Sequence, residues 1–545
     1  MAKKVFLSKS IFTSDNDAPV SGAIVVNGDL IEYVGTAEDA PYTDEDEVID
    51  LGSKTITPGL IDCHVHAYPG IKMEQNNACF LNPMYSMDEL IDAMRTFIAE
   101  NPEPVNGIYY FFDYDFSQSG MLMRYEMDEL FGDAAIMLTD ISLHGGTFTT
   151  KALEVLQFDF EAPLPEGSVV HYEEAGTPGY FVEGVYFMLH IRAMTMGGEK
   201  NADQTIDEIQ RRFNAQGFTA IVEMRPMGNI KDYVWAEERY LQREAEGSLT
   251  LRVGACSSLT SDRKYWEEDI RRLKGDFVFF NALKGFMDGG FINSTAWTTA
   301  EYIAGPNEGQ HPGPANDMEL YAAKIKEAND LGIGVRVHAE GDLAIEKALE
   351  MYVQSDNLEV LNQIEHCTAM TPRTEQKIKE YVASGRKLAI NFQPIFLYAE
   401  APTEEHPVDC GNEFYDACAV RVNSAIKTGA IVSVVSTDFP VVQPSASRHI
   451  RVAVNRLADE EGSVFYGDGY TPDEAITLPQ AIIGNTRNAA IAIGRGHDLG
   501  IIRPGYKADF TVFNADIFEM DRPEYRNIDI YKTIVGGKEV YSAKE

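Results

Sequence analysis

Basic residues are scarce in this chain of 545 residues. It has 46 lysines and arginines against 85 aspartates and glutamates, which gives a formal net charge of −39 at pH 7. Nucleic acids and anionic membranes attract proteins through positive charge, so this balance argues against both as partners. The apolar runs are all shorter than the roughly 18 residues that a membrane-spanning helix needs, and the first residues do not read as a secretory signal. We therefore expect a cytoplasmic protein.

Cysteine is also infrequent. None of the six cysteines is paired with another in the Cys-x-x-Cys spacing of many metal-binding and redox motifs. This usage is typical of a reduced chain and argues against a disulfide scaffold. Apolar residues make up 44% of the chain, an ordinary share for a globular protein. The fold is therefore expected to depend on a large hydrophobic core.

The two ends of the chain resemble each other more than either resembles the middle. Residues 1–57 and 497–545 contain short apolar runs separated by turns, and Asn27-Gly28 between two such runs is a hairpin signal. We expect the two ends to assemble into one small β unit.

Residues 58–496 alternate apolar strands with amphipathic helices. A helix is expected to begin at Thr371-Pro372 and to end at Gly385, for example. The expected strands are 58–64, 218–224, 251–256, 280–284, 333–338, 361–366, 387–393 and 431–437. Eight strands that alternate with helices predict an α/β fold with a closed parallel barrel. Residues 67–215, between the first two strands, are too many for a structureless loop, so we expect an inserted subdomain above the barrel mouth.

Several potential metal ligands fall at the ends of these strands. His64 and His66 point to the same side of the chain because strand side chains alternate with a period of two. The other candidates end a strand or lie within one: Lys284, His338, His366 and Asp438. The C-terminal ends of barrel strands converge on one face, where imidazoles and a carboxylate suit a zinc-like divalent cation. One histidine at a strand end is more often a structural residue, and it is the joint pattern that predicts a metal site.

Six segments carry a resemblance to a known family. They are TPGLIDCHVH, LKGFMDGG, VRVHAEGD, IEHC, STDFP and LGIIRPGYKADFTVFNAD. They resemble the amidohydrolase superfamily, and within it the YtcJ-like hydrolases and N-substituted formamide deformylases. The chain departs from that branch at Thr149-Thr150, where an asparagine-serine pair is usual.

The resemblance implies a (β/α)8 TIM barrel over 58–496, with a terminal β-sandwich domain from 1–57 and 497–545. It also implies two zinc ions. His64, His66 and Asp438 would hold one ion and His338 and His366 the other, with Lys284 bridging both after carbamylation by CO2. The implied activity is hydrolysis of a C–N bond in a small amide or formamide.

Roles beyond the metal site follow less directly. Asp438 is expected to take a proton from the attacking water, and His144, Glu183 and Asp288 are candidates for substrate contact. The aromatic run at 109–116 could line a pocket or pack as ordinary core. A homo-oligomer, in the simplest case a dimer, is expected.

Two alternatives remain open. One is a mononuclear deaminase of the same superfamily, which Glu340 near His338 would suit but Lys284 argues against. The other is a catalytically inactive regulatory relative, which usually loses metal ligands.

Overall fold

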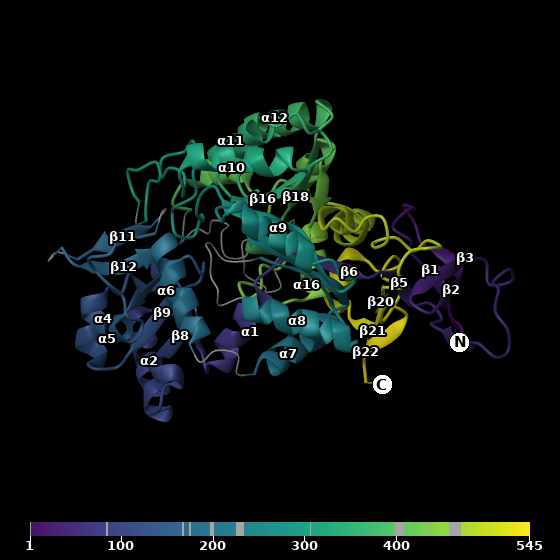
Figure 1. The fold of residues 1–545 in the computed structure, drawn as a ribbon, viewed down its shortest axis with the longest axis horizontal. Helices are drawn as coiled ribbons and strands as arrows, with labels where there is room; N and C mark the ends of the chain where they lie inside the picture. Colours follow the sequence, from purple (N-terminus) through teal and green to yellow (C-terminus); the bar gives the residue numbers. More distant parts are fainter. Residues whose placement is uncertain are drawn as a thin grey trace.

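The computed structural model describes residues 2–82, 85–165, 168–173, 176–196, 201–224, 234–305, 307–397, 408–434, 436–456 and 470–544. Three parts follow one another along the longest axis of the molecule (Figure 1). Strands from the two chain ends lie at one end and a parallel barrel lies in the middle. Most of the segment between the first two barrel strands lies at the opposite end.

The barrel sheet has eight parallel strands in chain order. They are β6 (Leu60–Val65), β13 (Phe218–Glu223), β14 (Arg252–Ser258), β15 (Val278–Phe286), β16 (Val335–Ala339), β17 (Leu361–His366), β18 (Lys387–Asn391) and β19 (Ile431–Ser433). Each overlaps a strand expected from the sequence; Val435, near the end of the last expected strand, lies outside the described residues.

The segment after β19 brings the two edges of the barrel sheet together. The backbone N–H of Asp438 donates to the carbonyl of His64 (2.9 Å), and that of His66 donates to the carbonyl of Phe439 (2.7 Å). The sheet is therefore a nearly closed barrel, and its closure joins the turn that carries Asp438 to the end of β6.

Helices cover the outside of the barrel, and their ends follow the expected signals. Thr371 accepts a hydrogen bond from the Thr374 N–H at the start of α12 (Pro372–Ala383), and Gly385 follows its end with a φ of 86°. The other α-helices described after β13 are α8 (Val234–Glu246), α9 (Arg263–Arg272), α10 (Met318–Asp330), α11 (Asp342–Tyr352), α14 (Asn412–Cys418), α15 (Val422–Lys427), α16 (Ala446–Asn455), α17 (Leu478–Ile483) and α18 (Ala489–Ala492). Within the described ranges, none of the helices is long and apolar enough to cross a bilayer.

Strands from both chain ends share one mixed sheet. It contains β1 (Lys4–Ile11), β2 (Val20–Asn27), β3 (Leu30–Gly35), β4 (Glu47–Asp50), β5 (Thr55–Pro58), β20 (Phe510–Phe513), β21 (Ile530–Val535) and β22 (Lys538–Ser542). The antiparallel pair β5–β20 joins the N-terminal strands to the C-terminal ones. A buried ion pair between Arg252 of β14 and Asp509 (2.7 Å) fastens this sheet to the barrel.

The segment between β6 and β13 contains a second sheet and seven described α-helices, of which the first and the last pack against the barrel. The strands are β7 (Cys79–Phe80), β8 (Tyr109–Tyr114), β9 (Ile136–Asp140), β10 (Gly145–Phe148), β11 (Val169–Tyr172) and β12 (Pro178–Val182). The helices are α1 (Ala67–Gln75), α2 (Met87–Glu100), α3 (Phe116–Ser119), α4 (Arg124–Phe131), α5 (Thr150–Val155), α6 (Gly184–Thr195) and α7 (Ala202–Ala215).

Two details of this segment answer questions that the sequence left open. In the aromatic run, Tyr110 and Phe112 are buried in one hydrophobic cluster, while Phe111 and Tyr114 are buried in another. The run is therefore ordinary core packing. The largely apolar residues 179–189 would also suit one continuous strand, but β12 ends at Val182, because Glu183 has a φ of 56° and turns the chain into α6.

Candidate metal centre

Six side chains, which come from five barrel strands and the segments directly after them, line one pocket at the barrel mouth. They are His64, His66, Lys284, His338, His366 and Asp438. The ring centroids of His338 and His366 are 4.5 Å apart, and those of His64 and His366 are 4.8 Å apart. The structure therefore brings together all six residues that the sequence predicts as ligands.

The first part of the centre consists of His64, His66 and Asp438. Oδ1 of Asp438 lies 3.3 Å from Nε2 of His64 and 3.4 Å from Nε2 of His66. The turn that carries Asp438 is fixed from below, because the Thr437 hydroxyl donates to the carboxylate of Asp62 (2.7 Å). Two imidazoles and a carboxylate that face one point can hold a divalent cation.

The second part consists of His338 and His366, with Glu340 beside them. One ligand atom from each of the three residues lies within 4.8 Å of the others. The Glu340 carboxylate also accepts a hydrogen bond from the Phe291 N–H (3.0 Å). The family resemblance implies Lys284 as the further ligand of these two histidines, while Glu340, the residue that would suit the mononuclear alternative, lies beside them.

Lys284 has the environment of a reactive amine. Its Nζ is buried, has no hydrogen-bond partner among the described residues, and lies 4.8 Å from the centre of the Phe286 ring. Burial lowers the pKa of Lys284 to about 8, which makes the neutral amine more accessible than in an ordinary lysine. Oδ1 of Asp438 likewise accepts no hydrogen bond within the described part of the chain. Two buried polar atoms left without hydrogen bonds fit a centre completed by metal ions.

Burial also sets the charge of the other candidate ligands. It lowers the pKa of His66 to about 3 and holds the pKa values of His64, His338 and His366 well below the usual range. It raises the pKa of Asp438 to about 6. All four imidazoles are therefore neutral at pH 7, which is the form that binds metal.

The segment between β6 and β13 supplies the other wall of the pocket. Its lining residues include His144 before β10 and Phe187, His190 and Ile191 on α6. Nδ1 of His144 lies 3.1 Å from the buried carboxylate of Glu183, which also accepts a hydrogen bond from the Thr295 hydroxyl (3.1 Å). Burial lowers the pKa of His144, but the charge and the hydrogen bond of Glu183, together with the charges of Asp140 and Asp438, outweigh burial and raise the pKa.

Asp288 lies behind the pocket wall. Its carboxylate accepts hydrogen bonds from the backbone N–H groups of Trp297, Glu340 and Gly341, at 2.8 to 3.0 Å. Its Oδ1 is 3.9 Å from Nε2 of His338. These contacts fix the loop after β16, and the predicted contact of Asp288 with substrate stays a prediction.

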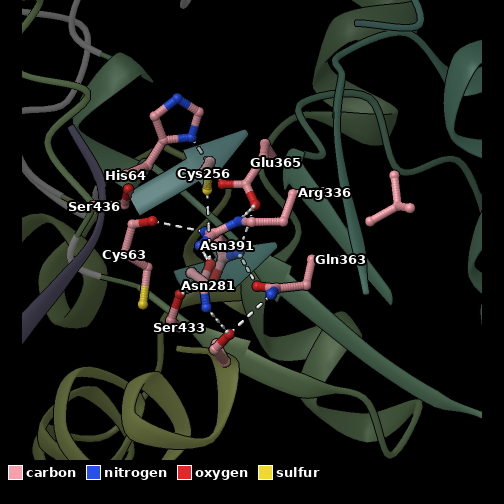
Figure 2. A network of polar contacts seen from close by, with 12 residues as sticks. Cys63, His64, Cys256, Asn281, Arg336, Gln363, Glu365, Asn391, Ser433 and Ser436 are labelled. Carbon is pink, nitrogen blue, oxygen red and sulfur yellow. Dashed lines mark hydrogen bonds and ion pairs between the residues drawn. The ribbon is translucent and has the colours of Figure 1, made fainter. Parts of the chain in front are cut away.

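The sequence interpretation missed the support beneath the centre. Nδ1 of His64 is 2.7 Å from Oε2 of Glu365, whose other oxygen is bound by Arg336 (Figure 2). One part of this support could have been predicted. Arg336 precedes His338 by two positions, and the alternation of a strand turns both side chains to the same face.

Known proteins resemble the chain from end to end. The model of the amidohydrolase family matches residues 47–541. The chain is 25% identical to the putative amidohydrolase YtcJ of Bacillus subtilis (strain 168) over 556 residues, which cover 99% of each chain. It is 23% identical to an N-substituted formamide deformylase of Arthrobacter pascens over 559 residues, which cover 98% of each.

A solved structure shows the same fold. An uncharacterized metal-dependent hydrolase from Pyrococcus horikoshii OT3 superposes with a TM-score of 0.72 at 21% identity, over 96% of this chain and 99% of that one. Because the family model spans nearly the whole chain, including every candidate ligand, this protein belongs to the amidohydrolase family.

Proposed function

We propose that the protein is a metal-dependent hydrolase that cleaves a non-peptide C–N bond, in an amide or N-substituted formamide of a small molecule. The observation that carries this proposal is the convergence of four neutral imidazoles, Asp438 and the amine of Lys284 on one pocket, where that amine has no hydrogen-bond partner among the described residues. The name of the Arthrobacter pascens relative supports the choice of bond.

The residues suit two divalent cations, and zinc is the metal we propose. His64, His66 and Asp438 would hold one ion, and His338 and His366 the other, with carbamylated Lys284 between them. In forming the carbamate, the neutral amine attacks the carbon of CO2 and a new N–C bond forms, while one C=O π bond opens and its electron pair goes to that oxygen. The nitrogen then loses a proton to water. When bound, the metals supply Lewis acidity, which lowers the pKa of a water nucleophile and polarises the substrate carbonyl.

Asp438 is the proposed proton carrier. Its Oδ1 lies against Nε2 of His64 and of His66 and accepts no hydrogen bond from the residues that the structure describes. It can therefore accept the proton of the attacking water there and pass it to the departing nitrogen. At pH 7 this carboxyl is mostly ionised, because burial raises its pKa only to about 6. Its proton affinity is then close to what a group that both takes and returns a proton needs.

The pocket wall indicates the kind of substrate. Apart from the candidate ligands, its lining is largely apolar and includes Met73, Leu143, Phe187, Ile191, Phe286 and Val441. An amide or formamide with an apolar substituent on nitrogen or carbon would fit this surface. His144, held by Glu183, is the polar group best placed to contact the substrate, and Asp288 would act from behind His338.

Separate hydrophobic clusters support the domain division. Residues 1–57 with 497–545 would form a β-sandwich domain and 58–496 the hydrolase barrel, with 67–215 inserted after its first strand. The terminal sheet and the inserted segment each have their own buried cluster. We further propose a cytoplasmic homodimer.

The test combines metal analysis with a substrate panel. Protein purified without chelators should contain two zinc ions per chain and should hydrolyse members of a panel of N-substituted formamides, linear amides, cyclic amides and lactones. One ion per chain together with ammonia release from amino-substituted heterocycles would favour a mononuclear deaminase, for which Glu340 beside His338 and His366 is the supporting feature. Protein that binds no metal and hydrolyses nothing would refute the proposal.

A further inference from the structure

A chain of buried polar side chains fills the barrel interior directly beneath the metal centre (Figure 2). Barrel interiors are usually filled by layers of branched apolar side chains. Here the strands β16, β17, β18 and β19 contribute polar residues that are each no more than 2% exposed: Arg336, Gln363, Glu365, Asn391 and Ser433. Groups of this kind are costly to bury unless every one is hydrogen-bonded, so their partners determine what the chain can do.

The end of this hydrogen-bond network that lies farthest from the metal centre fixes which groups donate and which accept. The backbone carbonyl of Ala492 can only accept, so the Gln363 amide must present its nitrogen there (2.8 Å) and its oxygen to Asn391. Nδ2 of Asn391 then donates to Oε1 of Gln363 (3.1 Å) and to Oε1 of Glu365 (2.8 Å). The side-chain oxygen of Asn391 accepts a hydrogen bond from the hydroxyl of Ser433 (2.6 Å). Every member from Ala492 to Glu365 is therefore fixed as donor or acceptor.

Glu365 lies at the other end of this hydrogen-bond network, next to the metal centre, and its carboxylate can only accept hydrogen bonds. Arg336, which carries its charge at any pH, donates from Nε to Oε1 of Glu365 at 2.8 Å. Its other nitrogens are engaged too, with the side-chain oxygen of Asn281 (2.7 Å) and the backbone carbonyl of Cys63 (2.6 Å). The second oxygen of Glu365, Oε2, faces Nδ1 of His64 at 2.7 Å. The Glu365 carboxylate already accepts hydrogen bonds from Arg336 and Asn391 at Oε1, and its Oε2 can also only accept. The facing Nδ1 of His64 must therefore be the donor, so the proton of His64 lies on Nδ1.

We propose that Glu365 is a positioning residue, which holds His64 with its proton on Nδ1 and thus leaves the Nε2 lone pair toward Asp438 and the metal site. Arg336 completes the arrangement, because its bond to the Cys63 carbonyl fixes the β6 backbone one residue before His64. The inference rests on the proposed metal site and adds to it a fixed tautomer and ring orientation before any metal arrives. Partners of this kind typically change metal affinity by about 10- to 100-fold.

The first experiment measures Zn²⁺ affinity by competition with a chromophoric chelator. Glu365→Gln keeps the shape of the side chain but removes its charge, and we expect it to bind Zn²⁺ about 10- to 100-fold more weakly than the wild type. Asp509→Asn is the matched control. Asp509 also forms a buried ion pair with an arginine of a barrel strand (Arg252, 2.7 Å), but it directly precedes β20 of the terminal sheet and does not contact the candidate ligands. The control should lose stability and keep its Zn²⁺ affinity.

Glu365→Gln with wild-type affinity would overturn the inference while leaving the proposed function intact. Zn²⁺ that fails to bind the wild type would instead overturn the proposed function.

The second experiment needs no substitution at Glu365, so it stands even if that variant does not fold. Nitrogen chemical shifts of ¹⁵N-histidine in the metal-free wild type should show His64 with its proton on Nδ1, the signal being assigned by its loss in His64→Gln. A proton on Nε2, or an equal mixture of tautomers, would overturn the inference whatever the protein hydrolyses.

Discussion

Removing Arg336 should destabilise the metal-free protein strongly, because it leaves a buried negative charge without its partner. Arg336 and Glu365 are both fully buried, and their bond is 2.8 Å long. Breaking such a pair from one side typically costs about 3–5 kcal/mol. We therefore expect Arg336→Met to lower the free energy of unfolding by that amount, as measured by urea denaturation of the metal-free protein. The exposed pair Arg263–Glu267 provides the control, since Arg263→Met should cost less than about 1 kcal/mol.

A second substitution separates lost charge pairing from lost packing. In Arg336→Met/Glu365→Gln no carboxylate remains to be stranded, so the double variant should be more stable than Arg336→Met alone. If the loss of stability in the double variant equals the sum of the losses in Arg336→Met and Glu365→Gln, the stranded carboxylate is not the cause of the destabilisation and the reasoning fails.

The same reasoning predicts how the stability difference between the wild type and Arg336→Met changes with pH. Burial raises the pKa of Glu365, but the charges of Arg336 and Lys284 outweigh it and hold the pKa below the usual value. In the wild type this carboxylate therefore stabilises the fold above the pKa of the unfolded state, and that stability is lost as the pH falls through the folded-state pKa. Without Arg336, the folded-state pKa rises above the unfolded value. The deficit of Arg336→Met should then be largest at neutral pH and shrink as the pH approaches 5, and a deficit that grows on acidification would contradict this account.

Three further predictions concern the metal centre. Asp438→Asn should lower kcat by on the order of 100- to 10,000-fold, because the proton carrier is lost, while metal analysis should show only partial zinc loss; near-full turnover would contradict its role. Zn²⁺ affinity, followed by chelator competition, should decline as the pH falls below about 6, where Asp438 becomes protonated while burial keeps the imidazoles neutral; equal affinity at pH 5 and pH 7 would contradict this. Loading apoprotein with zinc in CO2-free buffer should give less active enzyme than loading with bicarbonate, and Lys284→Met should abolish that difference; an effect of bicarbonate that survives in Lys284→Met would exclude the carbamate as its cause.

The barrel and most of the centre could be predicted because their signals are local. Apolar runs between helix caps predict the strands, and the ends of parallel strands must meet at one face. His64, His338 and Asp438 each follow an apolar run, so the alternation of the strand and its end position were enough to find them. The family resemblance then assigned the roles.

The position of Glu365 beneath the centre depends on backbone geometry that the sequence does not display. Glu365 and His366 are adjacent, so simple alternation turns only one of them toward the barrel interior. Both reach it because His366 has a φ of 69°, in the left-handed region that a residue other than glycine seldom adopts. Glu183 has a similar effect in the inserted segment, where a φ of 56° ends a strand that the apolar pattern would have continued.

The most direct test of the central claim is the anomalous scattering of zinc in crystals of the metal-loaded protein. The account predicts two peaks in one pocket, one against His64, His66 and Asp438 and the other against His338 and His366, with density for a carbamate on Lys284 between them. A single peak, or an unmodified Lys284 that contacts neither ion, would contradict it.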